Sequence, residues 1–149
     1  MIDYKAREAF VSADPSHAEL ERKAQEVRDE ASSVHAELVR LTYKMQRLLI
    51  LRDVALEQMW KLEDLGDEAD ATLKDLTANN GEAWCGMVSQ GIEDLQEMIF
   101  TLCNTIAEQS NHHKALELER KERWDLVWAK GKELRAVWDA QQKEAKAEV

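Results

Sequence analysis

The fold is decided by residues 20–76, which read LERKAQEVRDEASSVHAELVRLTYKMQRLLILRDVALEQMWKLEDLGDEADATLKDL. We counted positions from Leu20 to Leu76 in alternating steps of four and three residues. An apolar residue occupies 15 of these 17 positions. The two exceptions are Arg52 and Gly66. An apolar repeat of seven residues sustained over eight heptads is typical of a long helix that buries one seam against another helix.

The ends of this helix are marked by capping and turn residues. Asp14-Pro15 offers an N-cap followed by proline at the first helical position. Residues 77–81, Thr-Ala-Asn-Asn-Gly, predict a loop because Asn and Gly tolerate the left-handed conformation. The apolar repeat restarts at Cys85 and runs to Ile106, which predicts an antiparallel pair of helices. A single helix running straight through the loop is the alternative.

Beyond Ile106 the strict seven-residue step places polar residues in the seam. Steps of 4, 4 and 3 through Leu116, Arg120, Trp124 and Val127 restore an apolar stripe, which indicates a stutter near residues 109–124. We therefore expect an all-α protein, a long antiparallel two-helix coiled-coil hairpin that dimerises into a four-helix bundle. Its expected parts are an N-terminal segment with a short helix (1–15), helix one (16–76), a loop (77–81), helix two (82–144) and a frayed tail (145–149).

One zone carries more apolar surface than a pair of helices can bury. Leu48-Leu49-Ile50-Leu51 is apolar on every side of a helix, and such a helix must be covered on every side. We predict self-association as a two-fold dimer, or docking of a helix from a different protein, or coverage by residues 1–13. The predicted interface residues are Leu49, Ile50, Leu51, Leu56, Trp60, Met98, Phe100 and Cys103.

Several single residues have predicted roles in this arrangement. Pairing the helices about residue 79 places Arg52 near Glu108, and this pair is predicted to set the register of the partner helices. The same pairing places Trp124 and Trp138 in the seam beside Val34 and Leu20. Trp128 lies off the seam in either register and is the candidate exposed anchor for a partner.

The negative charge of the chain is unevenly distributed. The 20 Lys and Arg against 30 Asp and Glu give −10, and residues 63–97 hold ten acidic groups against Lys74 alone, a local charge of −9. An acidic docking tip for a basic protein is the functional hypothesis, an ordinary solvated surface the alternative, and direct nucleic-acid binding is disfavoured. The candidate tip residues are Asp64, Asp67, Glu68, Asp70, Asp75, Glu82, Glu93 and Asp94.

The sequence shows no pattern typical of catalysis, metal binding or cofactor binding. His112 and His113 are adjacent, so they point about 100° apart on a helix, and no histidine has Glu three residues before it. Gly-rich phosphate loops and nucleophile elbows are lacking. We therefore expect no enzyme activity, no metal and no cofactor.

The cellular setting is predicted from the cysteines and the apolar runs. Cys85 and Cys103 are too few for a disulfide framework and are expected to be buried thiols. The opening Met1-Ile2-Asp3-Tyr4-Lys5 is polar, and the longest run of large aliphatic residues is four, so we expect neither a secretory signal nor membrane insertion. The expected location is cytoplasmic or nuclear.

These observations favour a non-enzymatic scaffold or adaptor that oligomerises and docks partner proteins. A chaperone or escort for a basic client is the second hypothesis. In length and heptad pattern the expected architecture resembles short coiled-coil hairpin proteins, such as stalk components of type III export machines and segments of cytoskeletal or kinetochore scaffolds. That resemblance implies a third function, a stalk-type component of an export, cytoskeletal or kinetochore assembly, and it concerns architecture rather than particular residues.

Overall fold

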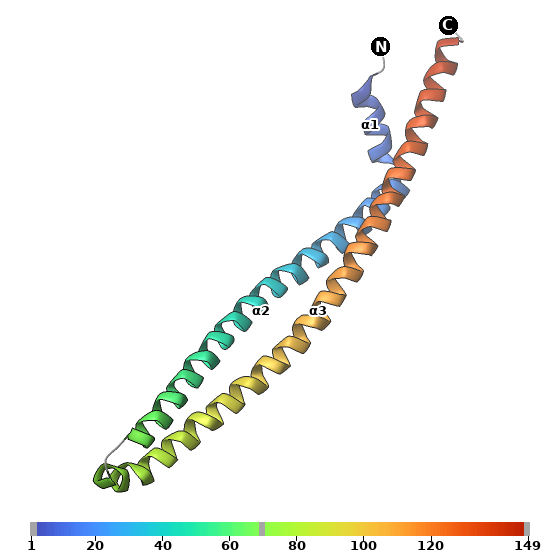
Figure 1. Cartoon of the computed structure of the whole chain (residues 1–149). Helices are drawn as coiled ribbons and strands as arrows, with labels where there is room; N and C mark the ends of the chain where they lie inside the picture. Colours follow the sequence, from blue (N-terminus) through green and yellow to red (C-terminus); the bar gives the residue numbers. More distant parts are fainter. Residues whose placement is uncertain (1–2, 69–70, 148–149) are drawn as a thin grey trace. The chain divides into compact units, whose positions relative to one another are not determined.

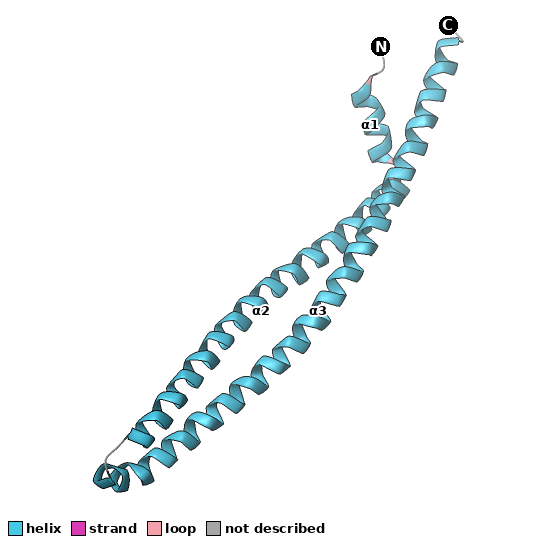
Figure 2. Ribbon diagram, viewed as in Figure 1, coloured by secondary structure: helices cyan, strands magenta, loops and turns pink. Residues whose placement is uncertain are grey.

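The computed structural model describes residues 3–68 and 71–147, with the side chains of 62–88 and 146 left out of the description. Every described residue other than Asp3 and Asp14 is helical (Figure 2). The three helices are α1 (Tyr4–Ala13), α2 (Pro15–Glu68) and α3 (Ala71–Ala147) (Figure 1). The prediction of an all-α protein is confirmed.

Carboxylates cap the first two helices. The side chain of Asp3 accepts hydrogen bonds from the backbone N–H groups of Lys5 and Ala6, both at 3.1 Å. Asp14 accepts from the backbone N–H of His17 at 2.9 Å, and Pro15 occupies the first helical position of α2. Each cap satisfies backbone donors that have no partner within the helix, which is why the chain breaks between α1 and α2 at Asp14.

The chain divides into two compact units. Unit 1 comprises Met1–Ala36 and Asn111–Val149, and unit 2 comprises Glu37–Ser110. Each unit therefore pairs a segment of α2 with a segment of α3, and unit 1 also contains α1.

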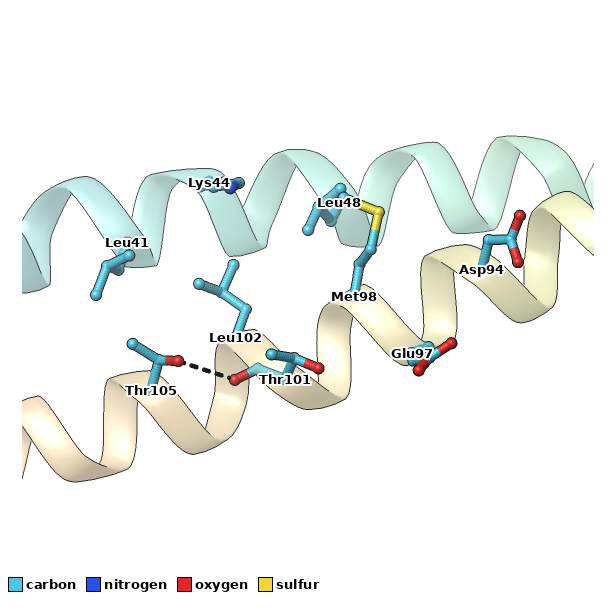
Figure 3. Close-up of a pocket in the computed structure, with 9 residues that line it drawn as sticks. All are labelled: Leu41, Lys44, Leu48, Asp94, Glu97, Met98, Thr101, Leu102 and Thr105. Atoms are coloured by element: carbon cyan, nitrogen blue, oxygen red, sulfur yellow. Dashed lines mark hydrogen bonds between the residues drawn. The ribbon is translucent and has the colours of Figure 1, made fainter.

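The core of unit 2 is a seam between its two helical segments. Leu41, Leu48 and Leu102 are buried together, and four partly buried residues pack against them: Met45, Leu95, Ile99 and Ile106. Residue numbers rise along α2 as they fall along α3, so the two segments are antiparallel (Figure 3). Buried apolar side chains of this kind each stabilise a fold by roughly 1.5–3 kcal/mol.

Burial follows the spacing that the sequence predicts. All twelve positions of the four-and-three step from Leu20 to Met59 are buried or half-buried. After the stutter in α3, the shifted step is buried or half-buried at Leu116, Arg120, Trp124, Val127, Gly131, Leu134 and Trp138. A seven-residue period with one four-residue insertion therefore describes which side chains leave water.

The loop expected at residues 77–81 is absent, because α3 runs through these residues and on to Ala147. α2 ends at Glu68, eight residues earlier than expected. Asn or Gly inside a helix costs only about 1 kcal/mol, so Asn79, Asn80 and Gly81 do not compel a turn. The single straight helix that was the alternative does not form either, because α2 ends at Glu68 and α3 is a separate helix.

The partners across the helices shift accordingly. In unit 1 the rings of His35 on α2 and His113 on α3 are in contact, and these residue numbers add to 148, whereas pairing about residue 79 requires 158. Within unit 1, the residue of α3 that faces a given residue of α2 therefore lies about ten positions earlier than pairing about residue 79 predicts.

Helix α1 packs against the C-terminal part of α3 within unit 1. The rings of Phe10 and Trp138 lie 5.3 Å apart between centroids, and Val11 is buried. The Arg135 guanidinium donates two hydrogen bonds to the Glu8 carboxylate, each at 2.9 Å. Trp138 therefore contacts α1, and the expected contact with Leu20 is wrong.

Candidate docking surface

The outer side of α2 in unit 2 exposes four large apolar side chains, with the exposed polar residues Gln46, Asp53 and Glu57 lying between them. Val39, Tyr43, Ile50 and Trp60 are each more than half exposed, and they follow one another at intervals of 4, 7 and 10 residues. These intervals are sums of three and four, so the four side chains share one side of the helix. Ile50 lies about 200° around the helix from Leu48 in the seam. We call these four residues the outer face.

The run Leu48-Leu49-Ile50-Leu51 shows how much of α2 is left uncovered. Leu48 is buried in the seam and Leu49 is half-buried at its edge, while Ile50 and Leu51 are 63% and 54% exposed. The sequence predicts a helix that is apolar on every side, and within unit 2 only one side of it is covered. Large apolar side chains exposed side by side make this part of α2 a candidate interaction surface.

A groove of about 560 Å³ runs beside the seam of unit 2. Its apolar floor is formed by Leu41, Leu48 and Leu102, and Figure 3 shows the Met98 sulfur turned toward Leu48. The remaining lining residues are polar or charged: Lys44, Asp94, Glu97, Thr101 and Thr105. The Thr105 hydroxyl donates to the Thr101 carbonyl oxygen at 3.1 Å, so it is already used within its own helix. The groove therefore combines an apolar floor with a polar rim.

The eight residues predicted as an interface do not share one face. Six are exposed, whereas Leu49 and Leu56 are half-buried. Met98 lines the groove, while Phe100 lies about 160° around α3 from it and is 68% exposed. The sequence analysis missed Val39 and Tyr43, although their spacing from Ile50 could have revealed them.

The predicted contact between Arg52 and Glu108 is wrong. Arg52 is half-buried in the seam, and its guanidinium lies 2.8 Å from the carboxylate of the adjacent Asp53. Leu48 shares the groove with Met98 and Leu102, so Arg52, one turn further along α2, faces positions before residue 98. The shift in helix pairing accounts for the error.

The prediction that both cysteines are buried is wrong for Cys103, which is exposed. It follows Leu102 directly and therefore lies on the flank of α3, where no described helix of unit 2 covers it. The side chain of Cys85 lies outside the described residues.

The acidic docking tip falls largely outside the described residues. Glu93 and Asp94 are described and exposed, and the Asp94 carboxylate accepts a hydrogen bond from Gln90 Nε2 at 3.0 Å. The side chains that lie outside the description are those of Asp64, Asp67, Glu68, Asp70, Asp75 and Glu82. The tip as a docking site therefore stays a prediction.

Trp128 lies at the rim of a second groove, in unit 1, and is 69% exposed. The groove has a volume of about 240 Å³ and is also lined by Trp124 and by the buried His17. The Nδ1 atom of His17 is buried without a hydrogen-bond partner in the described structure. The exposed indole of Trp128 therefore stays a predicted anchor for a partner.

All four histidines belong to unit 1. The rings of His35 and His113 lie 5.4 Å apart, and His112 Nε2 lies 3.6 Å from a carboxylate oxygen of Glu30. Among the described residues, no group of three or more His, Cys, Asp or Glu side chains is placed to hold a metal ion.

Ion pairs along the helix surfaces shift the pKa of several carboxyl groups. Hydrogen bonds from Arg22 and Lys23 lower the pKa of Glu19 to about 2. The hydrogen bond from Arg135 lowers the pKa of Glu8 below its ordinary 4.5. Exposed pairs of this kind contribute little to stability because solvent screens them, so they support the helices and do not mark a reactive site.

The chain matches no protein-family model, and comparisons with curated proteins and with solved structures return no match. Within the described residues, none of the helices combines the length and the apolar character that crossing a membrane requires. Function must therefore be argued from the surfaces described above.

Proposed function

We propose that this chain is a non-enzymatic scaffold that forms a coiled-coil helical hairpin and self-associates into a four-helix bundle. The observation that supports the proposal is the exposure of large apolar side chains on one short length of unit 2, with Ile50 and Phe100 each more than 60% exposed. A length of helix with this many exposed large apolar side chains is typical of an interaction surface. A second helical pair laid over it would remove these side chains from water.

The energetics favour a moderate, concentration-dependent association. Covering Val39, Tyr43, Ile50 and Trp60, each about 60% exposed, on both of two copies would contribute roughly 7–14 kcal/mol. Bringing two molecules together costs an estimated 4–15 kcal/mol in lost freedom of motion. Because the two quantities are of similar size, the association is expected to be weak enough to depend on concentration.

Light scattering after gel filtration tests the proposal across concentrations of about 1–200 μM. The wild-type chain should approach twice its 17.1 kDa mass as concentration rises. Trp60→Glu combined with Phe100→Glu should hold it at the monomer mass, because charged side chains resist burial. Leu118→Glu is the matched control, since Leu118 is equally exposed but lies in unit 1. A monomeric wild type, or an unchanged mass in the double variant, would overturn the proposal.

The scaffold would present its acidic segment to basic partner proteins. The exposed carboxylates of Glu93 and Asp94, within a segment of net charge −9, support this second part of the proposal. Binding of a basic protein such as lysozyme should weaken as salt rises, and Glu93→Lys with Asp94→Lys should weaken it further. Binding that is indifferent to both changes would exclude the acidic segment as the docking site.

A further inference from the structure

We propose that the groove beside the seam of unit 2 binds a helical segment of a basic partner protein, one with a stripe of apolar side chains and with lysine or arginine at one end only. The inference rests on the proposed docking of basic proteins to the acidic segment. It adds the place where the partner is held and the pattern of residues that is recognised. It is carried by the apolar floor of the groove and by the opposite charges at its two ends.

The groove offers apolar surface that a partner side chain can cover. Three seam residues form its floor: Leu41, Leu48 and Leu102. On the α3 side Met98 is 48% exposed, so a side chain seated against it removes apolar surface from water. On the α2 side Leu51 lies seven residues after Lys44, two turns along the same side of the helix, and is 54% exposed. Amphipathic helices bind such grooves through apolar residues spaced three and four apart.

The two ends of the groove carry opposite charges. The carboxylates of Asp94 and Glu97 lie at one end, and Lys44 lies toward the other (Figure 3). All three side chains are exposed. In the described part of unit 2 the ion pairs lie within α2, and none of them uses Lys44, Asp94 or Glu97. A bound lysine or arginine is therefore attracted at the Asp94 end and repelled at the Lys44 end.

This difference in charge extends beyond the groove. At the Asp94 end lies the segment of residues 63–97, with its net charge of −9. At the Lys44 end, residues 37–47 of α2 contain three basic groups and one acidic group, and residues 101–110 of α3 add only Glu108, which gives +1 for the two stretches together. A partner with one basic end is therefore drawn into a single orientation along the groove.

Three synthetic peptides, each labelled with fluorescein, test the inference by fluorescence anisotropy with the full-length chain. The one-ended peptide is a helix with leucines spaced three and four residues apart and lysines at its C-terminal end. The two-ended peptide has the same composition, with the lysines divided between both ends. The leucine-free peptide has alanine in place of each leucine. The one-ended peptide should bind about tenfold more tightly than either of the others, because it alone matches both the floor and the charges.

Reversing the charge at Lys44 predicts a gain of binding, which a damaged fold would not produce. Lys44→Glu should tighten binding of the two-ended peptide about tenfold, since its second group of lysines then meets a carboxylate. Lys121→Glu is the matched control, because it makes the same change in net charge at an exposed lysine of unit 1. Met98→Gln should weaken binding of the one-ended peptide about fivefold without any change in charge.

The outcomes separate the groove from the acidic segment. Equal gains for Lys44→Glu and Lys121→Glu would show that only total charge matters, and equal affinities for the one-ended and leucine-free peptides would show that the floor is not used. Either result overturns the groove as a binding site and leaves the proposed docking of basic proteins intact. The same holds if no peptide binds while lysozyme binding still weakens with salt. If lysozyme binding is also indifferent to salt and to Glu93→Lys with Asp94→Lys, both proposals fail.

Discussion

Replacing Leu102 by alanine should destabilise the protein by about 2–3 kcal/mol. Leu102 is 8% exposed and lies in the buried cluster with Leu41 and Leu48. Leucine-to-alanine substitutions in protein cores cost about 2–5 kcal/mol, the higher values arising where a rigid cavity remains. Here the groove of unit 2 opens directly beside the cluster, so neighbouring side chains and water can fill the space. The expected loss therefore lies in the lower half of that range.

Urea denaturation followed by circular dichroism at 222 nm measures the effect. The free energy of unfolding should fall by the stated amount with little change in the slope, since the surface exposed on unfolding is nearly unchanged. Both proteins must be compared at one concentration, because self-association would stabilise the folded state by mass action.

Leu118→Ala is the matched control for this substitution. It makes the same chemical change in the same helix, but Leu118 is 67% exposed. Its effect should stay within about 0.5 kcal/mol of zero, as is usual at exposed sites. Equal losses for the two variants would refute the reasoning, because burial in the seam would then not be what stabilises the helix pair.

Three further predictions concern the N-cap of α2, the contact between α1 and α3, and the seam of unit 2. Asp14→Ala should cost about 1 kcal/mol in urea denaturation by removing the N-cap, and an unchanged midpoint would contradict that role. Because Arg135 lowers the pKa of Glu8 below 4.5, this ion pair is intact above that pH and is lost as the pH falls through the lowered value. The indole N–H resonance of Trp138 should therefore move as the pH is lowered from about 5 to about 3 in the wild type and less in Glu8→Gln, and equal shifts would refute the link. Arg52→Leu should raise the melting temperature without changing the oligomer mass by light scattering, and a changed mass would reinstate Arg52 as a register-setting residue.

The buried side of each helix could be predicted from the sequence because it depends on a local period. Alternating steps of four and three residues give the buried positions of α2 from Leu20 to Met59. With one four-residue insertion, the same steps give the buried positions of α3 as far as Trp138. Which residues meet across the seam depends instead on where the chain reverses. The residues chosen for the turn, Asn79, Asn80 and Gly81, disfavour a helix by only about 1 kcal/mol each, which neighbouring helical residues offset.

The sequence predicts which apolar residues are left over from the seam, but not on which sides of the helices they lie. The excess of apolar residues at Ile50, Trp60 and Phe100 is visible in the sequence because these residues lie off the repeat. Their division between different flanks follows from the helix pairing, and so does the separation of Arg52 from Glu108. The contact between Glu8 and Arg135 spans 127 residues and leaves no local pattern in the sequence.

The paired seam of unit 2 limits how the length of this chain can change during evolution. Deleting one residue between Leu41 and Leu48 turns the following part of α2 by about 100°, so Leu48 and the seam residues after it no longer face α3. Insertions or deletions of seven residues keep the seam, but they must be matched in the facing stretch of α3 if each side chain is to keep its partner. Related chains are therefore expected to differ in length by whole heptads, gained or lost in both helices together.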